Sequence, residues 1–169
     1  GGVSSHGVLI LHKLGAKVSV ATRSLEHKEY LESLGAHEVL LFDGLLEKRR
    51  ALSTEKWDGV LDTTGGEALG NILTEVKYGG IVCTSGNLSG IRFESTVFPF
   101  ILRGITLKGI DSVMVDHAMR NDIFKKLATS WHSENLGRTV KNVISFNELR
   151  EELLNPSEGA GRVVVDMNI

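Results

Sequence analysis

The chain begins with a glycine pair, Gly1 and Gly2, and an apolar helix pattern follows it at once. Apolar side chains recur at helical spacing up to Leu14, Gly15 is placed to end the helix, and residues 18–22 have the pattern of a buried strand. This order is typical of a dinucleotide-binding βαβ unit, in which backbone amides and the helix dipole face a pyrophosphate. Such a unit also needs a strand before its turn, and we expect that strand, with the first glycine of the motif, upstream of Gly1.

Two interpretations of the glycine pair remain open. In the first, Gly1 is the second glycine of a G-x-G-x-x-G motif and Ser4 takes the third position, where a small residue allows close packing of helix and strand. In the second, the pair is a flexible end or the remnant of a tag. The alternation of strands and helices in the rest of the chain favours the first interpretation.

Composition limits the class of protein. The chain has 169 residues, of which 41% are hydrophobic and 24% charged, and a net charge of −2. These values describe a globular chain with one good core and argue against a nucleic-acid partner. The sequence has no apolar run that could span a membrane, no signal peptide, and one cysteine, Cys83, which cannot form an internal disulfide. We therefore expect a cytoplasmic protein without a membrane partner.

Strand and helix patterns alternate along the chain, which predicts an α/β fold with a Rossmann-type doubly wound parallel sheet, lacking its first strand. Strands are predicted at residues 39–42, 59–63, 81–85 and 105–110. Helices are predicted up to Leu34, with Gly35 after it, and over residues 69–76, with Gly79 and Gly80 as the stop. The charged residues 47–50 are interpreted as a solvated helix face.

The predicted strand 18–22 ends in Thr22-Arg23-Ser24. A Rossmann fold carries its ribose-selecting residue at this place, where an acid favours NAD. These three residues include no acid that would repel a 2′-phosphate. The guanidinium group of Arg23 offers several hydrogen-bond donors, and the neighbouring Thr22 and Ser24 each offer a hydroxyl group. We interpret this pattern as a preference for NADPH. The alternative is that Arg23 is a solvated loop residue and that Ser24 caps the next helix.

The predicted strand 81–85 is followed by Gly86 and Asn87. Ligands of such folds bind at the carboxyl edge of the sheet, so these two residues form a site candidate. The alternative is an ordinary turn, because glycine and asparagine are common in turns for backbone reasons. From about Asp116 the alternation is lost, although a capping-box signal stands at Ser145 and Glu148.

Two sequence blocks are more specific than the glycine turn: Phe-Pro-Phe-Ile-Leu-Arg at residues 98–103 and Gly-Ile-Asp-Ser-Val-Met at residues 109–114. Weaker matches in the same order are residues 1–3, 11–15, 30–31, 34–36, 62–63 and 78–80. Together these blocks resemble the acryloyl-CoA reductase branch of the quinone oxidoreductases, which are zinc-free members of the medium-chain dehydrogenase/reductase superfamily. The resemblance covers the length of the chain.

The resemblance implies residues 1–115 as an NADPH-binding Rossmann domain, truncated at its start. It implies residues 116–169 as a segment that returns toward a mostly absent catalytic domain. The implied cofactor-binding residues are Gly1, Gly2 and Val3 for the pyrophosphate, Thr22, Arg23 and Ser24 for the 2′-phosphate, and Gly86, Asn87 and Ile101 beside the ribose and nicotinamide. The sequence departs from the family at Ser4, where relatives usually have glycine, and at Arg23, because the basic residue of relatives falls one place later.

The implied reaction is hydride transfer from NADPH to the activated double bond of a small-molecule substrate, such as an enoyl thioester, an enone or a quinone. The group that polarises the substrate is expected in the absent domain, so no catalytic residue is assigned here and the chain alone is expected to be inactive. The family pairs sheet edges across a two-fold axis, which predicts a homodimer through residues 105–110. A non-catalytic NADPH-binding or regulatory module is the alternative.

Metal chemistry has no candidate site in the sequence. A catalytic zinc needs three protein ligands and a structural zinc commonly needs clustered cysteines. The chain has one cysteine and six scattered histidines. His6 and His12 fall on different faces of the first predicted helix, so no metal ligands are assigned.

Overall fold

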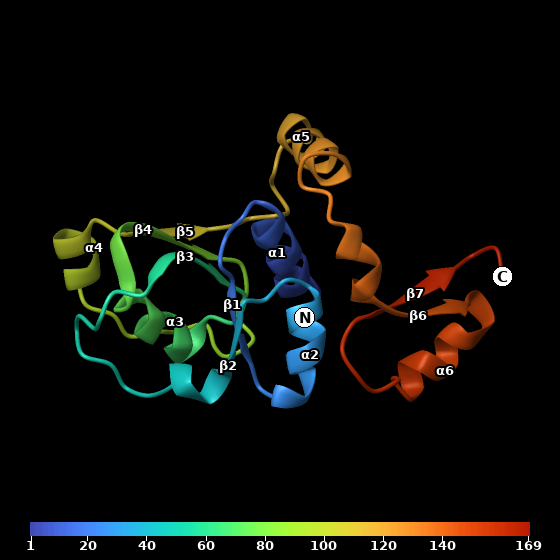
Figure 1. The fold of residues 1–169 in the computed structure, drawn as a ribbon, viewed down its shortest axis with the longest axis horizontal. Coiled ribbons are helices and arrows are strands. Elements are labelled where there is room, and N and C mark those ends of the chain that lie inside the picture. The colour runs from blue at the N-terminus through green and yellow to red at the C-terminus, as the bar shows by residue number, and fades with distance from the viewer. The chain divides into compact units, whose positions relative to one another are not determined.

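The computed structural model describes residues 1–169, and the chain divides into two units (Figure 1). One unit is formed by Gly1–Leu40 together with Asn121–Ile169, and the other by Leu41–Arg120. The helices are α1 (Gly2–Lys13), α2 (Lys28–Ser33), α3 (Gly66–Leu73), α4 (Phe98–Arg103), α5 (His117–Ala128) and α6 (Leu149–Leu154). The strands are β1 (Ser19–Thr22), β2 (Glu38–Leu41), β3 (Trp57–Asp62), β4 (Val76–Thr84), β5 (Thr106–Gly109), β6 (Val140–Ser145) and β7 (Arg162–Asp166).

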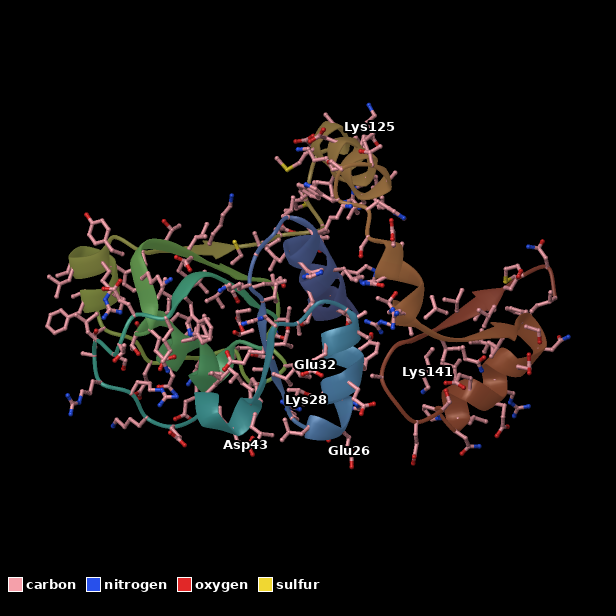
Figure 2. The ribbon with its side chains drawn as sticks, viewed as in Figure 1. Glu26, Lys28, Glu32, Asp43, Lys125 and Lys141 are labelled. Atoms are coloured by element: carbon pink, nitrogen blue, oxygen red, sulfur yellow. The ribbon has the colours of Figure 1, made fainter.

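Helices α1 and α2, with the residues that directly flank α2 and precede β1, supply an apolar core cluster of the first unit. Its buried residues are Val8, Leu9, Val18, Leu31, Leu34 and Ala36. Both helices end as the sequence predicts, because Gly15 and Gly35 adopt φ of +84° and +108°, which favour glycine. The exposed surface of α2 carries an ion pair between Lys28 and Glu32 at 3.8 Å, one helical turn apart (Figure 2).

The C-terminal part of the first unit contains the parallel pair β6 and β7, with Ser145 opposite Asp166. The predicted capping box is confirmed directly after β6. Glu148 Oε2 accepts hydrogen bonds from both the amide and the hydroxyl of Ser145, each at 2.8 Å. This cap opens a 3-10 helix at Phe146–Glu148, and α6 follows it.

The second unit is built on a parallel ladder in the order β3-β4-β5. Asp62 pairs with Thr84, and Thr84 with Gly109, so the carboxyl ends of the three strands lie together. The chain passes through α3 between β3 and β4 and through α4 between β4 and β5. Its buried core consists of Leu69, Leu73, Val76, Val82 and Ile105.

The parallel α/β class predicted from the sequence is confirmed, but the strands form three separate sheets instead of one. These are β1-β2, β3-β4-β5 and β6-β7.

Two local predictions were wrong. The charged residues 47–50 are not helical, and Arg49 instead donates to the carbonyl of Gly44 at 2.6 Å. Helix α3 ends at Leu73, and Gly79 and Gly80 lie inside β4, where the pairing with β3 is irregular. A Cβ atom on Gly80 would lie 2.8 Å from the carbonyl oxygen of Asp58, so glycine lets the strands approach closely. None of the helices reaches the length and apolar content that crossing a bilayer requires.

Candidate functional site

The predicted pyrophosphate turn lies at the start of α1. Gly1 is the N-cap residue, and its carbonyl accepts the amide of Ser5 at 3.0 Å. No side chain caps the helix, no acid lies in its first turn, and Val3 is 61% exposed. Backbone amides at the positive end of a helix dipole fit an anionic group such as a pyrophosphate.

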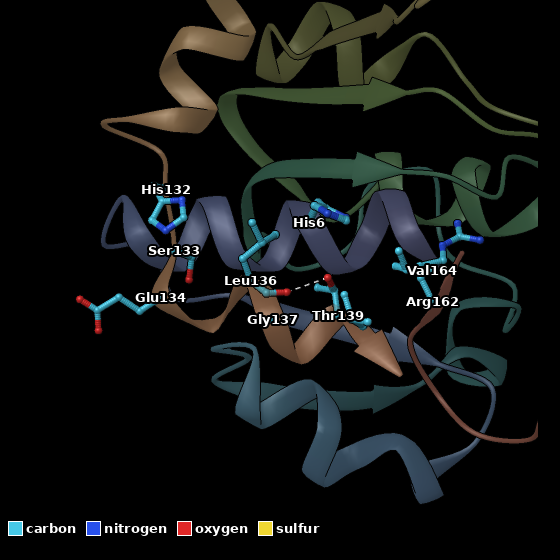
Figure 3. Close-up of a pocket in the computed structure, with 10 residues that line it drawn as sticks. His6, His132, Ser133, Glu134, Leu136, Gly137, Thr139, Arg162 and Val164 are labelled. Atoms are coloured by element: carbon cyan, nitrogen blue, oxygen red, sulfur yellow. Dashed lines mark hydrogen bonds between the residues drawn. The ribbon is translucent and has the colours of Figure 1, made fainter. Parts of the chain in front are cut away.

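Arg162 of β7 lies against the same turn, which the sequence did not predict. A Cβ atom on Gly2 would lie 2.5 Å from Nε of Arg162, so the missing side chain of Gly2 makes room for the guanidinium group. Arg162 also borders an open cavity of about 610 Å³ in the first unit (Figure 3). Other residues that line this cavity include His6, Leu136, Gly137, Thr139 and Val164. Because Gly2 and Arg162 stand at opposite ends of the chain, no local pattern could reveal their contact.

The three residues predicted to bind the 2′-phosphate lie at the end of β1: Thr22 is its last residue, and Arg23 and Ser24 follow it. Thr22 Oγ1 donates to the carbonyl of Ser24 at 3.0 Å, and Ser24 Oγ accepts the amide of Glu26 at 3.2 Å. Ser24 is therefore the N-cap of a 3-10 helix at Leu25–His27, as the alternative interpretation stated. Arg23 is exposed between these two residues. A phosphate-binding role for the three residues stays a prediction.

Gly86 and Asn87 follow β4 in the second unit, at the carboxyl end of the ladder. A Cβ atom on Gly86 would overlap the carbonyl oxygen of Thr63, so the packing requires glycine. Asn87 is exposed, and its carbonyl accepts the amide of Gly90 at 3.0 Å in a local turn. The pair thus forms a turn at the edge where parallel α/β folds bind ligands.

Asp62, the last residue of β3, holds this edge of the ladder together. Its carboxylate is buried, with the residue 7% exposed. Oδ1 accepts the amides of Thr64 and Gly65 and the hydroxyl of Thr64, each at 3.0 Å, and Oδ2 accepts the hydroxyl of Thr84 at 2.6 Å. We refer to these four residues as the Asp62 network. Its sequence signal is an acid near the end of the predicted strand 59–63, directly before Thr-Thr-Gly-Gly, and the sequence pattern did not mark Asp62 as a site residue.

Helix α4 carries the predicted contact Ile101, which is 68% exposed. The arginine that ends the same sequence block has a structural role. Arg103 Nη1 donates to the carbonyls of Thr74 at 2.7 Å and Val76 at 3.1 Å, and Nη2 donates to that of Ser53. These bonds fix the end of α4 to the residues around the start of β4.

A buried acid also lies at the start of β4, opposite to the predicted ligand edge. The side chain of Glu75 is 5% exposed and accepts Lys56 Nζ at 2.9 Å and Trp57 Nε1 at 3.3 Å, with Arg49 Nε at 3.5 Å. Two cations and a hydrogen bond compensate the burial of this carboxylate. The structure contains no group of three or more His, Cys, Asp or Glu that could hold a metal ion.

The parallel strands, the uncapped glycine start of α1 and the turn after β4 define a Rossmann-type chain of the nucleotide-binding class. Residues 2–129 match the family described as zinc-binding dehydrogenase. The chain belongs to this family.

Individual relatives support the resemblance seen in the sequence. The chain is 36% identical, over 99% of its length, to the protein named "Putative quinone oxidoreductase YhfP" of Bacillus subtilis and also to acrylyl-CoA reductase AcuI of Ruegeria pomeroyi. The crystal structure of Bacillus subtilis YhfP with NAD bound matches 99% of the chain with a TM-score of 0.91 and 35% identity. That of the Salmonella enterica YhdH oxidoreductase in complex with NADP matches 99% with a TM-score of 0.87 and 32% identity. The chain spans 52% of the length of each of these proteins.

Proposed function

We propose that the protein containing this chain is an NADPH-dependent reductase of the quinone oxidoreductase and acryloyl-CoA reductase type. It would transfer a hydride to the activated carbon–carbon double bond of an enoyl thioester, an enone or a quinone. The observation that carries the proposal is the match over 99% of the chain to relatives named quinone oxidoreductase and acrylyl-CoA reductase, beside matches of equal coverage to structures solved with NAD or NADP bound. The glycine start of α1 and the turn after β4 support it, because a helix N-terminus and the carboxyl end of a parallel ladder are places where α/β folds bind a dinucleotide.

The preference for NADPH is proposed from the tip of β1. An acid that would repel a 2′-phosphate is absent from residues 22–24, and Arg23 is an exposed cation there. The relatives include one solved with NAD and one with NADP, so the choice of cofactor depends on the residues of the chain itself.

The chain's contribution to the reaction is binding and orientation. Gly1, Gly2 and Val3 would hold the pyrophosphate, Arg23 the 2′-phosphate, and Gly86, Asn87 and Ile101 the nicotinamide half. The bound nicotinamide would supply the hydride, which is chemistry of the cofactor and not of the protein. No residue among 1–169 is assigned to polarise the substrate or to donate the final proton.

Zinc is implied by the family description, but the residues of the chain do not fit it. Cys83 is the one cysteine, and the structure groups no three metal-binding side chains. These residues supply no metal site, so no step is derived through a metal, and the zinc-independent reaction is proposed from the resemblance to the quinone oxidoreductases alone.

The proposal is tested by calorimetric titration of the full-length protein with NADPH and with NADH. We expect Arg23→Ala to weaken NADPH binding about tenfold and to leave NADH binding unchanged, since one charge-assisted contact to the 2′-phosphate is lost. Arg150→Ala is the matched control, because Arg150 is an exposed arginine on α6. Equal weakening of both cofactors, or of neither, would remove the 2′-phosphate assignment.

The catalytic part needs a separate measurement. NADPH oxidation should depend on an added enoyl thioester, enone or quinone. Tight NADPH binding without such turnover would favour the non-catalytic binding module instead. Binding of neither cofactor would contradict the proposed function as a whole.

A homodimer through β5 is a further part of the proposal. This strand is at one edge of the second unit's ladder. Three of the five residues that follow it are apolar and exposed: Ile110 at 43%, Val113 at 79% and Met114 at 81%. An unpaired strand edge beside exposed apolar side chains is suited to pairing with a second copy of the chain.

A further inference from the structure

Asp62 contacts the end of β4 through its side chain and its backbone. Its Oδ2 accepts the hydroxyl of Thr84 at 2.6 Å, and its carbonyl accepts the amide of Ser85 at 2.9 Å. Ser85 directly precedes the turn formed by Gly86 and Asn87. The position at which this turn leaves the ladder is therefore set by bonds to one residue of the neighbouring strand.

The same carboxylate also fixes the turn at residues 63–66 through the amides of Thr64 and Gly65. This turn packs directly on the segment after β4. The amide of Ser89 donates to the carbonyl of Thr64 at 2.8 Å, and a Cβ atom on Gly65 would lie 2.7 Å from the carbonyl oxygen of Gly90. Backbone packed this closely cannot shift on one side alone, so loss of the Asp62 bonds displaces residues 86–90 as well.

We propose that Asp62 is a positioning residue that holds the Gly86–Asn87 turn where the nicotinamide half of the cofactor binds. The inference rests on the proposed function, because it needs a dinucleotide at this edge of the ladder. The chemistry requires a carboxylate. Both oxygens of Asp62 face donors, whereas an asparagine would offer one acceptor and direct its own NH₂ group at a donor.

The test is Asp62→Asn in the full-length protein, with calorimetric titration of two ligands. NADPH would contact both the residues assigned to the 2′-phosphate and those assigned to the nicotinamide half. The ligand 2′,5′-ADP lacks the nicotinamide half, so it would contact the 2′-phosphate residues and not the Gly86–Asn87 turn. We expect the Kd for NADPH to rise about tenfold, since buried donors lose their acceptor, and the Kd for 2′,5′-ADP to stay unchanged. This split distinguishes positioning from a general loss of structure.

Two further substitutions accompany the test. Asp58→Asn is the matched control, because Asp58 lies on the same strand and its exposed carboxylate pairs with Lys77 at 2.8 Å. Thr84→Val removes the hydroxyl bond to Asp62 with little change in shape, and Thr84→Ser keeps it. We expect the valine variant to weaken NADPH binding severalfold and the serine variant to bind like the wild type. This pair decides the question if Asp62→Asn fails to fold.

Three results would contradict the inference. An Asp62→Asn protein that binds NADPH like the wild type shows that the network does not position the turn. Equal weakening of NADPH and 2′,5′-ADP shows a general structural role. Equal NADPH affinity of the valine and serine variants shows that the bond from Thr84 to Asp62 does not position the turn. A wild-type protein that binds neither ligand contradicts the proposed function itself, which is a different failure.

Discussion

Gly86 is required by the space around it and not by its backbone conformation. It does not have a positive φ, but a Cβ atom there would overlap the carbonyl oxygen of Thr63. We predict that Gly86→Ala lowers the free energy of unfolding by about 1–3 kcal/mol, because backbone atoms cannot yield as a flexible side chain can. Urea unfolding measures this change. Gly44→Ala is the control, since nothing lies within 4 Å of a Cβ atom on Gly44, and equal midpoints for both variants would refute the packing argument.

For single residues, the sequence predicts the place in a strand, turn or helix better than it predicts the side chain or backbone group that the residue contacts. Gly86 and Asn87 do follow a strand at the carboxyl end of the ladder, and Ser24 does cap a helical turn. The partner of Asp62 was not predictable, because Thr84 stands 22 positions away and meets it only when β3 and β4 pair in register. The same holds for Gly2 and Arg162, whose contact depends on how the first unit folds.

At the element scale, the capping box after β6 gives a pH-dependent prediction. The pKa of Glu148 lies below its ordinary value because the amide and hydroxyl of Ser145 donate to the carboxylate. The pKa is thus lower in the folded than in the unfolded protein. Ionised Glu148 therefore contributes stability above its unfolded pKa of about 4.3, and this contribution is lost as the pH falls through the folded pKa.

The prediction compares the wild type with Glu148→Gln. We expect the wild type to unfold at the higher urea concentration at neutral pH, and the difference to shrink below about pH 4. A difference that stays constant down to about pH 3 would show that the carboxylate charge does not matter to the cap. Glu151→Gln provides a comparison at an exposed acid of α6.

Apolar periodicity predicts most elements, because each helix or strand buries one face. The errors came where contacts between distant segments decide the local structure. Gly79 and Gly80 were interpreted as a helix stop. However, Val76 is completely buried and pairs with Trp57, so β4 already begins at Val76 and the two glycines lie within the strand. Arg103 shows the same dependence, because its acceptors come from segments far away in the sequence.

At the scale of the whole molecule, the proposed dimer depends on the free edge of β5. Ile110 donates its amide to Thr84 at 2.9 Å, so by strand alternation the amide of Gly109 points away from β4. We predict that Gly109→Pro removes this outward donor and converts a dimer to a monomer in sedimentation velocity. Gly109→Ala should stay dimeric, since a Cβ atom there meets nothing within 4 Å. A dimeric proline variant would place the interface elsewhere.

The division of the chain into units also has a consequence for synthesis. The second unit is one continuous segment, Leu41–Arg120, and all of its strands are synthesised before the C-terminal segment of the first unit. The first unit combines Gly1–Leu40 with Asn121–Ile169, so it cannot be completed until β7 is translated. Since domains fold as units during translation, the continuous unit should form before the first unit, because α1 and β1 need partners that are translated after Arg120.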